Sequence, residues 1–130
     1  MSQENVEIVE QFHKAYRERE LDVIAETILD PEIEWRASDM FGVLHGSGAV
    51  VAHLNDFVAS FDDPEMAATD LLDAGENVVA VLQGSGMGRT GGARVDFRFA
   101  VVYSLRANKI VLVREFETRT EALKAVGLEE

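Results

Sequence analysis

The segment 94–118 constrains the fold more than any other, because it reads as two β-strands joined by a two-residue turn at Ala107-Asn108. β-Branched and aromatic residues fill both halves of the segment, as expected for strands on a pleated, half-buried surface. A two-residue turn fixes the register of a hairpin, so Arg106 is expected to pair with Lys109. The segment therefore predicts an antiparallel hairpin, and its apolar residues near the turn predict that both of its faces are covered.

Counting outward from this turn divides the hairpin into two faces, because side chains alternate across a strand. Regular pairing predicts three facing pairs, Val102 with Val113, Ala100 with Glu115, and Arg98 with Glu117. One face then carries a charged cluster at its far end, made of Asp96, Arg98, Glu115 and Glu117. The other face is more apolar and would by itself be taken for the core or for a dimer surface; it carries Phe97, Phe99, Tyr103 and Phe116. Chemistry is expected at the charged cluster.

The charge balance limits the classes of partner. The chain has 24 acidic and 12 basic side chains and a net charge of −12, which repels phosphate backbones and anionic lipids. Nucleic acid and membranes are therefore not expected as partners. There is no cysteine, so disulfides and thiolate chemistry are excluded. The polar N-terminal residues predict no signal peptide, and no apolar run reaches the roughly 20 residues of a membrane span, so a cytoplasmic protein is expected.

The remaining periodicities predict one α+β domain over residues 1–130, a length that suits a single core. Helices are expected over residues 3–19, 20–29 and 48–61, with a short strand at 33–36. Two further strands, 66–73 and 77–84, are followed by a glycine-rich loop at 84–92 and by the hairpin strands 94–105 and 109–118. The pattern Thr118-x-x-Glu121 is typical of a capping box and predicts a last helix over 119–126.

Four segments resemble the SnoaL-like, polyketide-cyclase-type proteins of the NTF2-like superfamily: ENVEIVEQFHKAYRERELDVI, LDPEIEW, HGSGAVVAHL and YSLRANKIVLVREFETRTEALKAVGL. The resemblance implies an NTF2-like cone, in which a curved antiparallel sheet packs against three N-terminal helices and a short helix ends the chain. It also implies a pocket for a small, mostly apolar molecule and a homodimer formed through the sheet. Because this scaffold serves isomerases, cyclases, dehydratases, epoxide hydrolases and binding proteins, the activity stays open.

The ketosteroid-isomerase branch of the superfamily offers a test residue by residue. The resemblance places its oxyanion-hole tyrosine at Phe12, its general-base aspartate at Trp35 and its second oxyanion donor at Ala100. None of these three side chains can perform the corresponding role. Ketosteroid-isomerase chemistry is therefore rejected for this chain, and the three positions are expected to be pocket walls instead.

The charged cluster resembles the aspartate–arginine–aspartate set of limonene-type epoxide hydrolases. In that interpretation Arg98 holds the acids Asp96, Glu115 and Glu117 in place, one acid protonates an epoxide oxygen, and another activates water. The order Asp-x-Arg is reversed relative to that family. The alternative is a cross-strand ladder of salt bridges without a chemical role.

The three histidines differ in their expected surroundings. His53 lies beside the apolar stripe of the third predicted helix, where an imidazole can move protons near neutral pH or serve only in packing. His45 precedes a glycine at the expected mouth of the pocket, and His13 is expected to face solvent. No metal-ligand spacing is present, so neither a metal nor another cofactor is expected. The predicted substrate-binding residues are Trp35, Phe12, Tyr16, Phe41, His45, Phe57 and Ala100.

Three functions remain open from the sequence. The first is cofactor-free acid–base catalysis of the cyclase, isomerase, dehydratase or epoxide-hydrolase type on a small apolar substrate, with Arg98, Glu115, Glu117, Asp96 and His53 as candidate catalytic residues. The second is a non-catalytic small-molecule binding protein. The third is a dimeric interaction domain with a filled core.

Overall fold

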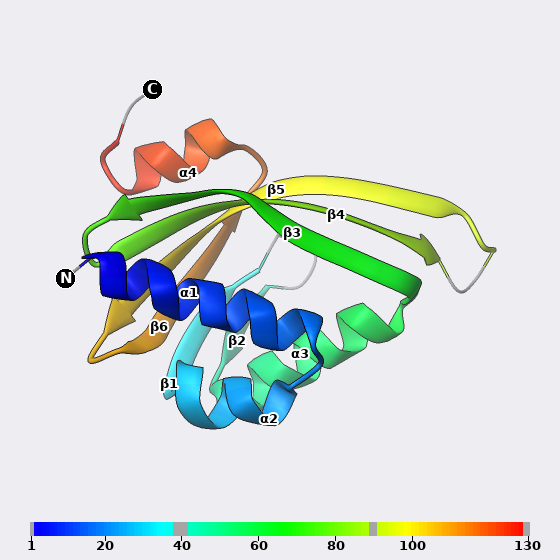
Figure 1. Ribbon diagram of the computed structural model, residues 1–130, viewed down its shortest axis with the longest axis horizontal. Helices are drawn as coiled ribbons and strands as arrows, with labels where there is room; N and C mark the ends of the chain where they lie inside the picture. Colours follow the sequence, from blue (N-terminus) through cyan, green and yellow to red (C-terminus); the bar gives the residue numbers. More distant parts are fainter. Residues whose placement is uncertain (1, 38–41, 89–90, 129–130) are drawn as a thin grey trace.

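The computed structural model describes residues 2–37, 42–88 and 91–128, and it forms an α+β cone (Figure 1). The N-terminal helical segments lie on the inner side of a curled sheet, and the last helix lies on its outer side. The elements are α1 (Ser2–Arg17), α2 (Leu21–Val23), a π-helical turn (Ile24–Ile28), β1 (Leu29–Arg36), β2 (Val43–His45), α3 (Ser47–Ala59), β3 (Phe61–Ala74), β4 (Asn77–Gly88), β5 (Arg94–Arg106), β6 (Lys109–Phe116) and α4 (Arg119–Ala125).

The sheet has the strand order β2-β1-β6-β5-β4-β3, which places the β5–β6 hairpin in its middle. Neighbouring strands run antiparallel except for β1 and β6, which run parallel. The parallel pair arises because the chain passes from β1 through β2, α3 and the three strands β3, β4 and β5 before β6 returns beside β1. The predicted curved sheet with three N-terminal helices and a short C-terminal helix is confirmed.

The turn of the β5–β6 hairpin has the predicted geometry. Ala107 and Asn108 both have positive φ, at 52° and 64°, as a two-residue hairpin turn requires, and Arg106 pairs with Lys109. A β-bulge follows directly. Leu105 pairs with Ile110 but Ser104 pairs with Leu112, so Val111 is an extra residue on β6.

This bulge shifts the register of β6 by one residue, and the facing pairs expected from regular alternation are wrong. Ala100 lies opposite Phe116 rather than Glu115, and Val101 lies opposite Glu115. Val102 lies opposite Arg114 rather than Val113, and β6 ends before it can pair with Arg98. A one-residue shift moves each later side chain of a strand to the other face relative to its partner strand. The bulge therefore places Glu115 on the opposite face of the sheet from Asp96 and Arg98 of β5.

Both faces of the hairpin are covered near the turn, as predicted. On the inner face Val101 and Tyr103 belong to the main core. On the outer face Ala100 and Val102 pack with Val79 of β4 against α4, through Ala122 and Leu123. The predicted capping box begins α4, because the Thr118 side chain accepts a hydrogen bond from the Glu121 backbone N–H and the Glu121 side chain accepts one from Thr118 N–H.

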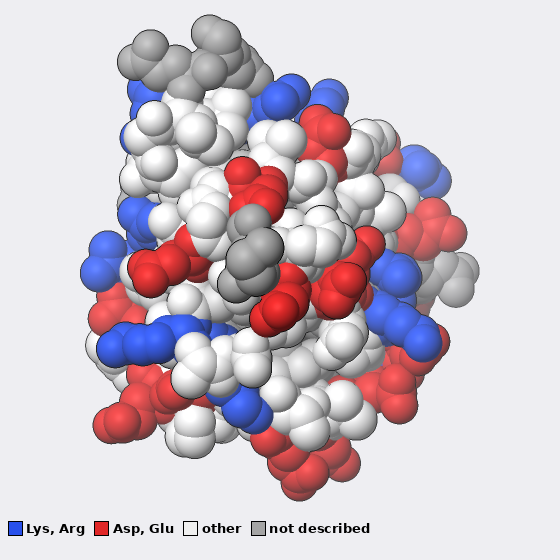
Figure 2. Space-filling view, turned by 60° about the vertical axis from the view of Figure 1, so that its left-hand side comes forward, with Lys and Arg blue, Asp and Glu red and all other residues white. Residues whose placement is uncertain are grey.

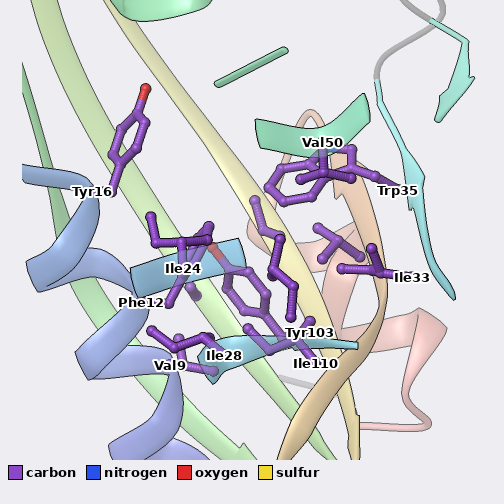
Figure 3. Close-up of a cluster of buried hydrophobic side chains, with 14 of the residues drawn as sticks. Val9, Phe12, Tyr16, Ile24, Ile28, Ile33, Trp35, Val50, Tyr103 and Ile110 are labelled. Carbon is purple, nitrogen blue, oxygen red and sulfur yellow. The ribbon is translucent and has the colours of Figure 1, made fainter. Parts of the chain in front are cut away.

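The main core lies between the N-terminal helical segments and the inner face of the sheet (Figure 3). Helix α1 contributes Val9 and Phe12, and the turn that follows α2 contributes Ile24 and Ile28, all at most 4% exposed. Strands supply the other side, with Ile33, Tyr103 and Ile110. Burial of such side chains stabilises the fold by roughly 1.5–3 kcal/mol each. Helix α1 forms because its apolar residues recur at helical spacing and so face this core together.

The glycine-rich stretch after residue 84 is not a loop at its start, in contrast to the prediction, because β4 continues to Gly88. A side chain at Gly84 would overlap the Phe97 ring and approach the Glu65 carbonyl oxygen to 2.8 Å. A side chain at Gly86 would come within 2.9 Å of Phe61 Cβ. The glycines therefore make room for two aromatic rings on the inner face of the sheet.

Two further boundaries differ from the sequence prediction. Strand β1 begins at Leu29 and includes the Asp30-Pro31 step, and β3 begins at Phe61 and includes Pro64. Strand β3 lies at an edge of the sheet. Proline has no N–H to donate, and an edge strand tolerates this because one of its sides has no neighbouring strand to bond. The third helix accordingly ends at Ala59 rather than at Phe61.

Acidic and basic side chains are interspersed over the face shown in Figure 2, on a chain whose net charge is −12. Within the described residues, no helix is long and apolar enough to cross a membrane.

Candidate functional site

A cavity of about 1020 Å³ lies between the helices and the inner face of the sheet. Such a volume lies at the upper end of the range that small organic ligands occupy. Its wall is mainly apolar, with aliphatic side chains such as Leu54, Met66 and Leu82. Aromatic rings from α1, β1, α3, β3 and β5 make up much of the rest: Phe12, Tyr16, Trp35, Phe57, Phe61, Phe97, Phe99 and Tyr103.

A tryptophan and a glutamate form a hydrogen-bonded pair on the cavity wall. Trp35 Nε1 donates to Glu115 Oε2 at 2.9 Å. The parallel pairing of β1 with β6 brings the two together, because Trp35 lies opposite Val113, whose side chain shares the inner face with Glu115. The indole is only 5% exposed and its ring packs near Phe12, at a centroid distance of 6.2 Å, and near His53, at 6.4 Å. The pair holds one carboxylate in a defined position in a mainly apolar cavity.

A second polar pair joins α1 to the sheet deeper in the cone. His13 Nε2 and the Tyr103 hydroxyl lie 2.9 Å apart, and both residues border the cavity. Tyr103 is 1% exposed, so its hydroxyl has left bulk water and depends on this partner. The prediction that His13 faces solvent is wrong, because its position on α1 turns the ring toward Phe12 and Tyr103.

Burial controls the protonation of the polar groups around this second pair. It lowers the pKa of His13 from 6.5 to about 4, with a smaller contribution from the charge of Arg17. It raises the pKa of Tyr16 from 10.0 to about 12, against a small opposing effect of Arg19. It also raises the pKa of Tyr103 well above its ordinary value, with Glu115 and Tyr16 adding to the effect. All three side chains are therefore neutral at physiological pH.

Six of the sequence-predicted site residues come together at the cavity. They are Phe12, Tyr16, Trp35, His53, Phe57 and Glu115. Arg98 and Glu117 border the opening, where β5 extends past the end of β6, and both are exposed. Phe41 lies outside the described residues. His45 is exposed on β2 and lies outside the cavity wall.

Of the predicted charged cluster, Arg98, Glu115 and Glu117 border the cavity and Asp96 does not. Asp96 and Arg98 alternate with Phe97 and Phe99, whose rings face inward, so their side chains belong to the outer face of β5. Asp96 instead pairs with Arg94 at 3.3 Å, and both of these side chains are about two-thirds exposed. Ala100 is also on the outer face, beneath α4, rather than in the pocket. The bulge at Val111 is the reason, since it leaves Glu115 on the inner face and the β5 charges on the outer one.

Sequence reasoning missed His13 as a residue of the cavity. Its signal is present in the sequence, because Val9, Phe12, His13 and Tyr16 follow the i, i+3, i+4, i+7 spacing of a single helix face. The rings of Phe97 and Phe99 were expected on the face opposite the pocket, and they form part of its wall instead. Among residues 2–37, 42–88 and 91–128, no three His, Asp or Glu side chains are grouped so as to hold a metal ion.

The curled sheet, the helices inside it and the aromatic cavity define a cone of the NTF2-like class. Residues 9–113 match the family model described as "SnoaL-like domain". The chain therefore belongs to the SnoaL-like family. No curated protein matches the sequence.

Solved structures with this fold cover most of the chain. A protein from Jannaschia sp. CCS1 described as a "Putative SnoaL-like polyketide cyclase" is 18% identical with a TM-score of 0.80, and the match covers 100% of this chain and 96% of that one. An NTF2-like protein from Burkholderia thailandensis is 26% identical with a TM-score of 0.77, and the match covers 85% and 88%. TerC, co-crystallised with polyporic acid, is 16% identical with a TM-score of 0.75, and the match covers 95% and 98%. These similarities show the shared fold.

Proposed function

We propose that the cavity binds a small, mostly apolar molecule and that the protein catalyses cofactor-free proton transfer on it, in a reaction of the cyclase, isomerase, dehydratase or epoxide-hydrolase type. The observation that carries this proposal is the Trp35–Glu115 pair, a carboxylate held by an indole N–H at 2.9 Å in a mainly apolar cavity. A carboxylate within reach of a bound substrate is a suitable general base or acid. TerC, a structural neighbour, was crystallised with the small molecule polyporic acid.

The roles follow from the positions of the side chains. Glu115 takes or gives the proton, and Trp35 is its positioning residue, because the indole N–H fixes Oε2. His53 is the second candidate for proton transfer, since it lies on the same wall beside Trp35. Asp96 and Arg98 have no role in this proposal, because Asp96 lies outside the cavity wall and Arg98 is exposed at the opening.

A general-base reaction with a visible product tests the proposal without knowledge of the natural substrate. In the ring opening of 5-nitrobenzisoxazole, the base takes the proton of the C–H next to nitrogen, the C–H electron pair forms the nitrile, and the N–O bond breaks to release a coloured phenolate. We expect turnover by the wild-type protein and a loss of about 100-fold or more in the Glu115→Gln variant. The Asp96→Asn variant, which removes the same charge from the outer face, is the matched control. Equal rates in wild type and Glu115→Gln would refute proton transfer by Glu115.

Binding without catalysis is the second candidate function. It is favoured by the location of the predicted catalytic residues, since Asp96 lies outside the cavity wall and Arg98 and Glu117 are exposed at its opening, which leaves Glu115 and His53 inside. Trp35 is the single tryptophan of the chain and borders the cavity, so its fluorescence reports occupancy directly. A ligand that quenches Trp35 in a protein that does not accelerate the ring opening would favour this candidate over the first.

The proposal includes a homodimer formed through the outer face of the sheet and a cytoplasmic location. Helix α4 packs on β4, β5 and β6, and on the more distant β2 the side chain of Val43 is 51% exposed. Sedimentation equilibrium of the wild type and of a Val43→Lys variant tests the dimer. A monomeric wild type would remove it.

A further inference from the structure

We propose that the ligand of this cavity carries a positive charge, as a substituted ammonium group attached to its apolar framework. This inference rests on the proposed function, because it takes the cavity to be the binding site. Such a site differs from a general apolar pocket in one measurable respect, because it binds a cation more tightly than a neutral molecule of the same shape.

The first argument is the aromatic part of the cavity wall. Phe57 of α3, Phe61 of β3 and Phe97 of β5 contact one another, with centroid distances of 5.3 Å between Phe57 and Phe61 and 5.6 Å between Phe57 and Phe97. Phe99 continues the cluster at 6.2 Å from Phe97. All four rings are half-buried and border the cavity. The face of an aromatic ring attracts a cation, and ammonium groups with apolar substituents bind readily among several such rings.

The second argument is the sign of the charge around the cavity. Three carboxylate side chains border it, those of Glu115, Glu117 and Glu121. Among the described residues that border the cavity, Arg98 at the opening is the one Lys or Arg side chain, so three carboxylates stand against one guanidinium. His13 stays neutral at physiological pH because burial lowers its pKa to about 4. The field in the cavity is therefore negative, which attracts a cationic ligand and repels an anionic one.

The third argument is that the acidic border is held in place. Glu121 is part of the capping box of α4, where its Oε1 accepts hydrogen bonds from Thr118 N–H at 3.2 Å and from Thr118 Oγ1 at 3.1 Å. Glu115 is fixed from the other side by Trp35 Nε1. Because Glu115 and Glu121 are oriented by their own partners, two of the three carboxylates that border the cavity are positioned before a ligand arrives.

Two probes of equal shape test the charge preference. The cation (3-hydroxyphenyl)trimethylammonium and neutral 3-tert-butylphenol differ only in the replacement of the quaternary nitrogen by carbon. We measure the dissociation constant of each from the quenching of Trp35 fluorescence at pH 6 and low ionic strength, where both phenols keep their proton. We expect the cation to bind about tenfold more tightly than the neutral probe, and added salt to reduce this preference. Equal affinities, or a preference for the neutral probe, would overturn the inference.

Charge-neutralising variants locate the effect. We expect Glu117→Gln and Glu121→Gln each to weaken binding of the cation by about two- to threefold and to leave the neutral probe unaffected. Glutamine at position 121 preserves the capping box, so α4 stays in place. Asp96→Asn removes the same charge from the outer face of β5 and should change neither affinity. A preference for the cation that persists unchanged in the Glu117→Gln/Glu121→Gln double variant would contradict the acidic border as its source.

The outcomes also separate this inference from the proposed function. If the neutral probe quenches Trp35 and the cation does not, the cavity binds apolar molecules and only the cationic preference fails. If neither probe quenches Trp35, the cavity itself is not a binding site and both proposals fail.

Discussion

The two faces of the β5–β6 hairpin come from one stretch of sequence but differ in what covers them. The outer face carries Ala100 and Val102, sealed by α4 near the turn, and then exposed charges farther out. The inner face passes from the buried Tyr103 to the half-buried Phe99 and Phe97, which line the cavity. The comparison shows that the number of apolar residues on a face of this hairpin does not distinguish the face that is packed under a helix from the face that lines the cavity. Half-buried aromatic rings mark the pocket, and small, fully buried residues mark the helix-covered side.

The largest expected effect comes from placing a charge on the sealed outer face. Ala100→Asp should lower the free energy of unfolding by about 3–5 kcal/mol, because a carboxylate beneath α4 would be buried without a partner. Urea denaturation followed by circular dichroism measures it. Arg98→Asp, two residues away on the same face but exposed, is the control and should change stability by less than about 0.5 kcal/mol. A fully stable Ala100→Asp variant would place residue 100 in the cavity instead.

The next effect concerns the dependence of stability on pH. The folded protein holds His13 neutral down to a pKa of about 4, whereas the unfolded chain protonates it below 6.5. The unfolded state therefore binds more protons between these values, and stability falls as the pH is lowered through this window. We expect wild type to lose up to about 2 kcal/mol more than His13→Gln between pH 7 and pH 4.5. Parallel urea titrations at the two pH values measure this difference, and identical losses would show that His13 is not buried as described.

A smaller effect is expected from the deep polar pair. Tyr103→Phe removes the hydroxyl 2.9 Å from His13 Nε2 and should cost about 1–2 kcal/mol, because a buried imidazole nitrogen loses its partner. A double-mutant cycle with His13→Phe isolates the coupling between the two side chains. Tyr16→Phe provides a matched loss of a hydroxyl from the same cavity wall. A coupling energy of zero would show that the pair does not contribute to the fold.

The smallest effect on stability and activity is expected at Arg98, which the sequence alone predicted to be a catalytic residue. Arg98→Ala removes an exposed side chain of the outer face, so its stability should stay within about 0.5 kcal/mol of wild type. Its rate of 5-nitrobenzisoxazole ring opening should equal that of wild type. A stable Arg98→Ala protein that no longer catalyses the ring opening would show that this arginine takes part in the reaction, in contradiction to the functional difference between the two faces.

Much of the fold follows from local sequence signals. The hairpin turn at Ala107-Asn108 and the capping box at Thr118 are confirmed, because each depends on a few adjacent residues with specific backbone preferences. The extent of β4 could not be predicted, since Gly84 is read as a turn residue by any local rule. Its place in a strand depends on Phe97, which approaches from the neighbouring strand.

The candidate site was only partly predictable for a related reason. Trp35 and Phe12 were expected in the cavity and lie on its wall, because the apolar pattern of their elements allows only one inward face. The hairpin has apolar residues on both faces, so alternation does not say which one is inward. A single bulge then determines which charged residues of β5 and β6 share a face, and the residue type at Val111 does not predict that bulge.

The bulge at Val111 also bears on how such pockets diversify. Strand β6 carries a carboxylate at Glu115 and a guanidinium at Arg114 side by side, and its pairing with β5 selects which of the two faces the interior. With every residue kept but Val111 paired in a regular ladder, Arg114 would lie opposite Val101 and enter the cavity in place of Glu115. The polarity of the cavity is thus encoded in a hairpin irregularity several positions away. An ancestral scaffold of this shape can invert the charge of its interior by moving one unpaired residue, with no substitution in the pocket.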